Sequence, residues 1–174
     1  MAVRAVVRYP AAVLKQRAHA LVPGPEAVAL CEDLVDTMRA SPACVGLAAP
    51  QIGVGARAFC LDVVKHPKTS TSNGLVVLIN PVIVVREGAE VIREGCMSLP
   101  DFTGNVRRSI LITVRGETPE GDPREITSEG FEARAFQHEI DHLDGLLFID
   151  RVSSLTADVF ARKRYAASRE PKTE

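Results

Sequence analysis

Apolar residues recur at helical spacing in two segments of the chain. Residues 25–40 carry acidic residues between the members of an apolar series: Val28, Leu30 or Cys31, Leu34, Val35 and Met38. Residues 131–143 place four side chains at intervals of four, three and four: Phe131, Ala135, His138 and His142. Such spacing brings side chains onto one face of a helix, so both segments are predicted to be helices. Gly145 marks the expected end of the second helix.

Short runs rich in valine and isoleucine predict strands around these helices. They are bounded by Gly, Pro or Asn and comprise Ala56–Val64, Leu75–Ile79, Val82–Val85 and Ser109–Val114. The polar segments His66–Gly74 and Glu117–Pro123 are expected to be exposed loops, the second of them in a hairpin. Another helix is predicted over Leu155–Ala167. The mixture indicates an α+β fold, with short antiparallel strands packed around the central helix at 131–143 and a C-terminal helix.

Length, charge and composition limit the classes of function. The chain has 174 residues, 46% of them hydrophobic, which suffices for one domain, residues 1–174, with a buried core. Its formal net charge of −1 argues against a DNA-binding protein. It contains no run of about 18 uncharged apolar residues, and the apolar residues of Met1–Pro10, interrupted by Arg4 and Arg8, form too short a run for a signal peptide, so a cytoplasmic protein without a membrane partner is expected. Its cysteines are then expected to be reduced.

The segment from His138 to His142 contains the pattern His-Glu-x-x-His inside a predicted helix. Two imidazoles one helical turn apart can bind one metal ion, and Glu139 between them lies close enough to act on a water at that ion. The pattern therefore predicts a catalytic metal site. The alternative is that both histidines are ordinary surface or partly buried residues.

A third ligand decides the class of metal site. The metzincin pattern would require histidine at position 148, which is Phe148, and a thermolysin-like site would require a glutamate found only in the polar tail, as Glu170 or Glu174. His19, in an expected helix, and His66, in a polar loop, are weaker candidates than a cysteine.

Cysteine is the better source of that ligand. Cys96 follows Gly95, which permits close backbone approach, and its thiolate suits a divalent ion. Cys31 and Cys60 fall in an amphipathic helix and an apolar strand, where cysteine is usually a small core residue.

Three segments together resemble the motifs of the peptide deformylase family. They are Gly46–Gln51 (GLAAPQ), Glu94–Ser98 (EGCMS) and Gln137–Gly145 (QHEIDHLDG). The resemblance runs over nearly the whole chain and implies a hydrolase that removes the N-formyl group from N-formylmethionine on nascent proteins. It implies Fe²⁺ as the divalent ion, with Zn²⁺, Ni²⁺ or Co²⁺ as replacements.

The resemblance also implies a role for individual residues. Cys96, His138 and His142 would bind the ion, and Glu139 would be the general base and then the general acid. The side-chain amide of Gln51 and the backbone N–H of Met97 would stabilise charge on the formyl oxygen. A simpler role for Gln51 is to cap its own loop.

A substrate pocket is expected beside the metal. Helix geometry and the resemblance together nominate its lining: Val45, Gly46, Gly95, Phe131, Arg134 and Ala135. An apolar pocket suits the unbranched side chain of methionine. Arg134 could instead be an ordinary solvated helix residue.

Two residues depart from the usual pattern of the family. Cys44 stands where glycine is usual, and Met97 stands where leucine is usual. If that glycine needs a positive φ angle, Cys44 would be strained. The two changes bear on activity and substrate preference rather than on metal binding.

Two other functions remain open from the residues alone. One is an HExxH endopeptidase with a different third ligand, and the other is a non-catalytic protein that binds nascent chains. The basic stretch around Arg162, Lys163 and Arg164 suggests a transient ribosome contact, although a solvated helix face is the simpler interpretation.

Overall fold

The structure, a computed structural model, describes residues 2–162 and contains two long helices and eight strands in that range. The helices are α1 (Pro25–Ala40) and α2 (Gly130–Leu143), as predicted. The strands are β1 (Gly46–Ala48), β2 (Ala58–Leu61), β3 (Val76–Glu87), β4 (Glu90–Cys96), β5 (Leu99–Arg108), β6 (Leu111–Glu117), β7 (Pro123–Glu129) and β8 (Val159–Ala161). Among the described helices, none is long and apolar enough to cross a lipid bilayer.

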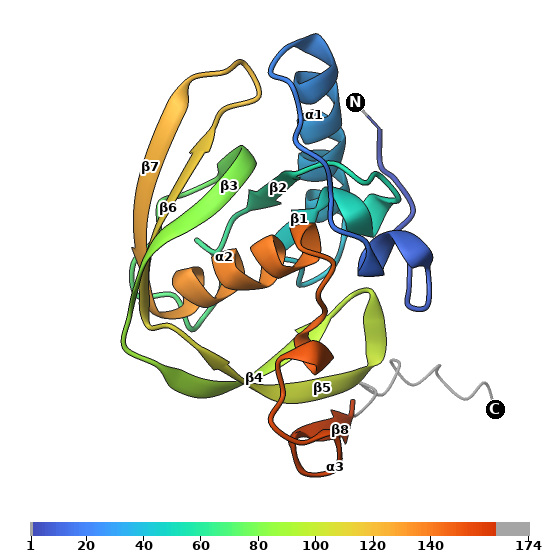
Figure 1. The fold of residues 1–174 in the computed structure, drawn as a ribbon, viewed down its shortest axis with the longest axis vertical. Helices are drawn as coiled ribbons and strands as arrows, with labels where there is room; N and C mark the ends of the chain where they lie inside the picture. The colour runs from blue at the N-terminus through green and yellow to red at the C-terminus, as the bar shows by residue number, and fades with distance from the viewer. Residues whose placement is uncertain (1, 163–174) are drawn as a thin grey trace, which may run out of the picture.

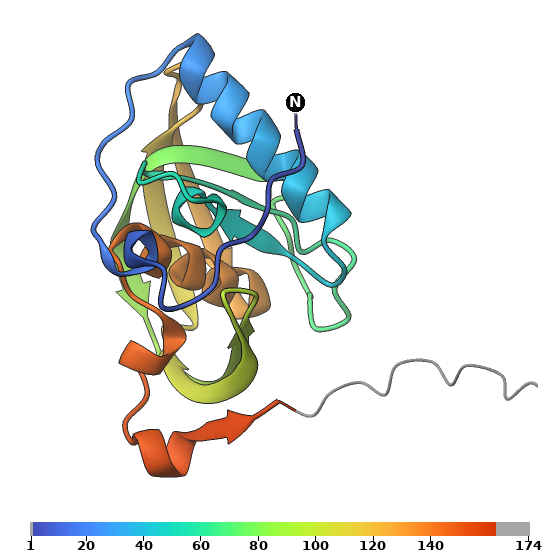
Figure 2. The same ribbon diagram turned by 90° about the vertical axis from the view of Figure 1, so that its right-hand side faces the viewer.

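The strands form two antiparallel sheets around α2. One sheet has the order β1-β2-β3-β6-β7 and the other the order β4-β5-β8. Figure 1 shows α2 in the middle of the molecule, with β3, β6 and β7 along one side and the β4–β5 hairpin beneath it. Figure 2 shows α1 lying across the outside of the larger sheet. The predicted α+β fold is therefore confirmed.

Several predicted boundaries were wrong. The strands expected at 75–79 and 82–85 are one strand, β3, which continues through Pro81 with one register shift across it, between Ile79 and Val82, and a second between Ile83 and Val85. The expected C-terminal helix is present only as α3 (Leu155–Asp158), because the chain then extends into β8 and pairs with β5. The rest of that predicted helix, from residue 163, lies outside the described residues. The Glu117–Pro123 loop does connect a hairpin, β6–β7.

The core lies on both faces of β2, which explains why this strand shows no apolar alternation. Phe59 and Leu61 pack with α2, whereas Ala58 and Cys60 pack with α1. Successive side chains of a strand point to opposite faces, so a strand covered on both sides is apolar throughout. The ring of Phe59 meets that of Phe136 edge to face at a centroid distance of 5.7 Å. This packing fixes α2 so that its other face is turned to the β4–β5 hairpin.

The substitution Phe136→Ala tests this packing. Phe136 is fully buried, and removing its ring should lower the free energy of unfolding by about 3–5 kcal/mol because it leaves a cavity against Phe59. Urea unfolding followed by circular dichroism measures the change. Val22→Ala is the control: that side chain is 81% exposed, so the expected effect is within about 0.5 kcal/mol. A loss below about 1 kcal/mol for Phe136→Ala would contradict the assignment.

Candidate metal centre

Three potential metal ligands converge between α2 and the end of β4. The ligand atoms of Cys96, His138 and His142 all lie within 4.8 Å of one another, and within residues 2–162 no second group of this kind occurs. The Sγ atom of Cys96 is 3.3 Å from Nε2 of His142. The two imidazole rings are 5.0 Å apart between centroids and nearly perpendicular, at 81°. One sulfur and two imidazole nitrogens form a donor set suited to a transition-metal ion.

The other cysteines and histidines lie elsewhere. Cys31 and Cys60 are core residues, as predicted. His19 is exposed and forms an isolated bridge with Ala56, so the helix expected around it was wrong. His66 is outside the ligand group but close to it, in the cavity described below.

The electrostatic surroundings favour the thiolate form of Cys96. Burial raises the pKa of this thiol, but the nearby imidazoles of His142 and His138 outweigh burial and hold the pKa well below its usual range. The thiolate is the form that binds metals. The sulfur ligand therefore has the protonation state that a divalent ion requires.

Glu94 fixes the orientation of His138. The Nδ1 atom of His138 is 3.0 Å from Oε2 of Glu94. An ionised carboxylate only accepts hydrogen bonds, so the imidazole proton must be on Nδ1, which leaves Nε2 free to bind metal. Arg108 in turn holds Glu94 by two hydrogen bonds, of 2.7 and 2.9 Å.

Asp141, which lies between Glu139 and His142 on α2, extends this charged cluster. It accepts a hydrogen bond of 2.6 Å from Arg108 and bonds of 2.7 and 3.1 Å from Arg151. The side chains of Glu94, Arg108 and Asp141 are all buried, and each is paired with an opposite charge, as burial of ions requires. The cluster connects α2 to β4, to β5 and to the segment after α2. This cluster was not predicted from the sequence.

Glu139 is a buried carboxyl group beside the three ligands. Its Oε2 atom has no hydrogen-bond partner among the described residues, and only 4% of the residue is exposed. Burial raises its pKa to about 7, although the imidazoles of His138 and His142 oppose this. A carboxyl group with such a pKa exchanges protons readily near neutral pH.

Gly46 makes room for that carboxyl group. A Cβ atom at this position would lie 2.6 Å from Oε1 of Glu139, far closer than atoms can approach. The first residue of the GLAAPQ segment must therefore be glycine if Glu139 is to keep this place.

Gln51 caps its own loop and also directs its side-chain amide toward the ligand group. Its Oε1 accepts a 2.9 Å hydrogen bond from the backbone N–H of Ala48, which caps the short 3₁₀ helix Ala49–Ile52. This bond turns the Nε2 atom toward Cys96 Sγ, at 3.5 Å, and Ser98 Oγ, at 3.4 Å. The amide is thus a donor held beside the ligand group.

A cavity of about 230 Å³ opens beside the ligands. All the residues predicted for the substrate pocket line it: Val45, Gly46, Gly95, Phe131, Arg134 and Ala135. Gln51, Met97 and Glu139 line it as well. Four lining residues were not predicted from the sequence: Ile92 and Arg93, from β4, and His66 and Lys68, from the β2–β3 loop.

Cys44 is not strained at its position. The positive φ angle in this loop, 58°, belongs to Ala43 instead. The Sγ atom of Cys44 donates a hydrogen bond of 3.1 Å to the carbonyl oxygen of Gly46. Burial, with a contribution from Glu139, raises the pKa of this thiol to about 12. Cys44 is therefore a neutral wall of the cavity rather than a second thiolate.

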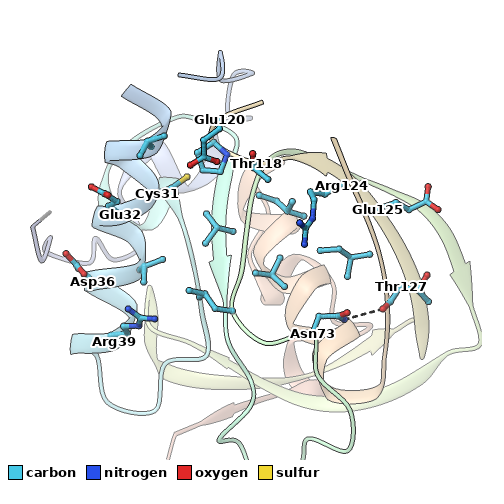
Figure 3. Close-up of a pocket in the computed structure, with 18 residues that line it drawn as sticks. Cys31, Glu32, Asp36, Arg39, Asn73, Thr118, Glu120, Arg124, Glu125 and Thr127 are labelled. Atoms are coloured by element: carbon cyan, nitrogen blue, oxygen red, sulfur yellow. Dashed lines mark hydrogen bonds between the residues drawn. The ribbon is translucent and has the colours of Figure 1, made fainter. Parts of the chain in front are cut away.

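A larger cavity, of about 630 Å³, lies between α1, the start of β3 and the β6–β7 hairpin (Figure 3). Its lining carries charges of both signs: Arg39, Arg124, Glu32, Asp36, Glu120 and Glu125. Burial raises the pKa of its one thiol, Cys31, to about 12. None of the three candidate ligands lines this cavity, so the smaller cavity is the candidate active site.

Acid titration tests the support that Glu94 gives to the fold. Burial raises its pKa, but hydrogen bonds from Arg108 and His138 outweigh burial and lower the pKa from 4.5 to about 2. The ion pair should therefore add about 3 kcal/mol to stability above pH 4.5, and the gain should disappear as the pH falls toward 2.

Urea unfolding of the wild type and Glu94→Gln across this pH range, at equal metal content, measures the difference. Glu125→Gln, in an exposed ion pair with Arg115, is the control and should cost less than about 1 kcal/mol. A difference between wild type and Glu94→Gln that stays constant with pH would contradict the prediction.

Comparison with known proteins agrees with this geometry. Residues 3–158 match the family described as Polypeptide deformylase. A peptide deformylase of Desulforudis audaxviator is 47% identical over 157 residues, which are 89% of this chain and 97% of that protein. The peptide deformylase structure from Thermus thermophilus has 39% identity and a TM-score of 0.78, covering 87% of this chain and 86% of that one.

A deformylase structure from Acinetobacter baumannii with Met-Ala-Ser bound has 30% identity and a TM-score of 0.80. It covers 87% of this chain and all of its own. The family match over residues 3–158 includes all three motif segments and strands β1 to β7. The chain belongs to the polypeptide deformylase family.

Proposed function

We propose that this protein hydrolyses the N-formyl group of N-formylmethionine at the start of nascent proteins. One observation carries the proposal: Cys96 meets His138 and His142 beside the buried carboxyl group of Glu139, at a cavity of about 230 Å³. Membership of the deformylase family supports the same reaction. The products are formate and a peptide with a free amino group.

The family implies a divalent metal ion, and the three ligands fit one. Cys96, His138 and His142 would hold it, and we propose Fe²⁺ as the native ion, with Zn²⁺, Ni²⁺ or Co²⁺ as replacements. When bound, the ion supplies Lewis acidity toward the formyl carbonyl group and toward water.

Glu139 is proposed to move the proton in both halves of the reaction. The water oxygen forms a bond to the formyl carbon while the water proton passes to Oε2 of Glu139. The C–N bond then breaks, and Glu139 returns the proton to the leaving amine. A pKa of about 7 suits both steps, because at neutral pH such a group can both accept a proton and donate one.

Two donors are proposed to stabilise the negative charge on the formyl oxygen. They are Nε2 of Gln51, which the Ala48 N–H orients, and the backbone N–H of Met97 next to Cys96. The methionine side chain is proposed to occupy the cavity between Val45, Phe131 and Ala135. The bound Met-Ala-Ser in the structure of the Acinetobacter baumannii relative supports a peptide of this kind as the ligand.

The structure weakens the two other functions considered from sequence. The endopeptidase hypothesis required a third ligand other than Cys96. In the structure, however, Cys96 lies with the two histidines. The non-catalytic hypothesis was motivated by the departures at Cys44 and Met97. In the structure, however, Cys44 is unstrained and its thiol is neutral. Neither alternative has an observation in its favour.

The partners are proposed to be formylated nascent peptides. A ribosome contact through the basic stretch stays a prediction, since Lys163 and Arg164 lie outside the described residues. A cytoplasmic location, the absence of a DNA partner, and a single domain over residues 1–174 also stay predictions.

The substitution Glu139→Gln tests the proposed mechanism. Removing the proton carrier should lower kcat for formyl-Met-Ala by about 10²–10⁴-fold while bound metal is retained. Formate release under anaerobic conditions and metal analysis measure the two quantities. Cys96→Ser should lose metal as well as turnover, whereas Glu125→Gln, on the surface, should change neither. The mechanism is wrong if Glu139→Gln keeps more than a tenth of the activity, or if acetyl-Met-Ala is cleaved as fast as formyl-Met-Ala.

The substitution Gly46→Ala tests the placement of Glu139 without removing it. The added Cβ would displace the carboxyl group, so kcat should fall by at least about 10²-fold while metal content is unchanged. Gly55→Ala is the matched control, because Gly55 also lacks a positive φ angle and its added Cβ would lie 4.0 Å from the nearest atom, so kcat should be unchanged. An unaltered kcat for Gly46→Ala would show that the contact between position 46 and Glu139 has no effect on catalysis.

A further inference from the structure

A stacked pair of rings forms one wall of the candidate active-site cavity. The imidazole of His66 lies over the phenyl ring of Phe131, with a centroid distance of 3.9 Å and an interplanar angle of 6°. Both residues line the cavity and both are half-buried. Phe131 comes from α2, and His66 comes from the loop between β2 and β3. The stack therefore joins a loop side chain to the helix that carries the metal ligands.

The backbone holds His66 in a fixed place. Its N–H donates to the carbonyl oxygen of Val63 at 2.9 Å, and its own carbonyl accepts from the N–H of Thr69 at 3.0 Å. The hydroxyl of Thr69 also donates to the Val63 carbonyl, at 2.7 Å. These bonds form two consecutive turns, so the imidazole is presented by an ordered segment rather than by a free loop.

The surroundings keep the imidazole neutral. The backbone N–H of Lys68 donates to Nδ1 of His66 at 3.2 Å, which places the proton of the neutral ring on Nε2. Burial, and then the charge of Lys68, lower the pKa of His66. A neutral ring packs on an aromatic face and forms an apolar wall better than a charged one does.

Phe131 is anchored on its own side. It packs against the core cluster around Ala133 and Phe136. The guanidinium carbon of Arg134 is 5.8 Å from the centroid of the Phe131 ring, and Arg134 is itself held by Glu90 and by the carbonyl of Gly130. The surface offered to a ligand is therefore a rigid pair of aromatic rings.

We propose that His66, stacked on Phe131, is a specificity-determining residue that selects the thioether side chain of methionine. The inference rests on the proposed function, because it assigns the wall against which the first side chain of the substrate packs. A polarisable sulfur interacts favourably with aromatic rings, often at the ring edge, and the edges are what a stacked pair of rings leaves free. His66 thus takes part in substrate binding and not in the chemical step.

Two substitutions distinguish loss of the ring stack from loss of the imidazole itself. His66→Ala removes the wall, and His66→Phe keeps an aromatic ring in its place. For formyl-Met-Ala-Ser, His66→Ala should raise KM by about 3- to 10-fold, with kcat within about twofold of the wild type. His66→Phe should restore KM. His19→Ala, at an exposed histidine outside the cavity, is the control and should match the wild type.

Substrate choice is the second measurement. The kcat/KM ratio of formyl-Met-Ala-Ser to formyl-norleucine-Ala-Ser compares a sulfur with a methylene group in the same position. The ratio should fall in His66→Ala and be retained in His66→Phe. Equal ratios in all three proteins would overturn the proposal, as would a His66→Phe variant as impaired as His66→Ala.

Binding of the product peptide Met-Ala-Ser, measured by calorimetry, separates this proposal from the proposed function. Weaker binding in His66→Ala but not in His66→Phe would support the role of His66 even if the wild type failed to deformylate. Normal turnover with unchanged KM and peptide affinity in His66→Ala would refute the role of His66 and leave the proposed function standing. A loss of kcat and bound metal in His66→Ala, with KM unchanged, would also refute it, because it would indicate a structural role.

Discussion

The buried ion cluster of Glu94, Arg108 and Asp141 is the interaction on which the arrangement of the site depends. It joins α2, which carries two imidazole ligands, to the β4–β5 hairpin, which carries the sulfur ligand. Burying three charged groups is unfavourable unless every charge is matched, so the helix and the hairpin are held in one relative position. The same cluster orients the imidazole of His138 through Glu94. The same contacts therefore hold the fold together and orient a metal ligand.

Local patterns allowed much of the site to be predicted from sequence. The spacing of His138 and His142 on one helix is a short-range property, and so is the face that they share with Phe131 and Ala135. The boundaries of α1 and α2 follow for the same reason, because both helices bury one apolar stripe. Cys96 was identified by excluding other ligands and by resemblance. The structure then brings its sulfur to within 3.3 Å of His142.

Long-range contacts account for what the sequence did not reveal. Strands β4 and β7 are rich in charged residues and half-exposed, so their apolar content is too low to mark them as strands. Strand β8 exists because it pairs with β5, which no local pattern specifies. His66 lies in a polar, turn-forming segment, and only the fold brings it over Phe131. The partners of Arg108 are likewise distant in the chain, at positions 94 and 141.

The close approach of Gly46 to Glu139 has a consequence for how this sequence can change. Two segments far apart in the chain share one small volume, so neither can be altered without regard to the other. A larger residue in the loop would displace the carboxyl group of Glu139, and only a shorter side chain on the helix would remove the clash. A shorter acid would not place its carboxyl group where Glu139 holds it. The loop at Gly46 and the helix at Glu139 therefore constrain each other through one steric contact, although they lie far apart in the chain.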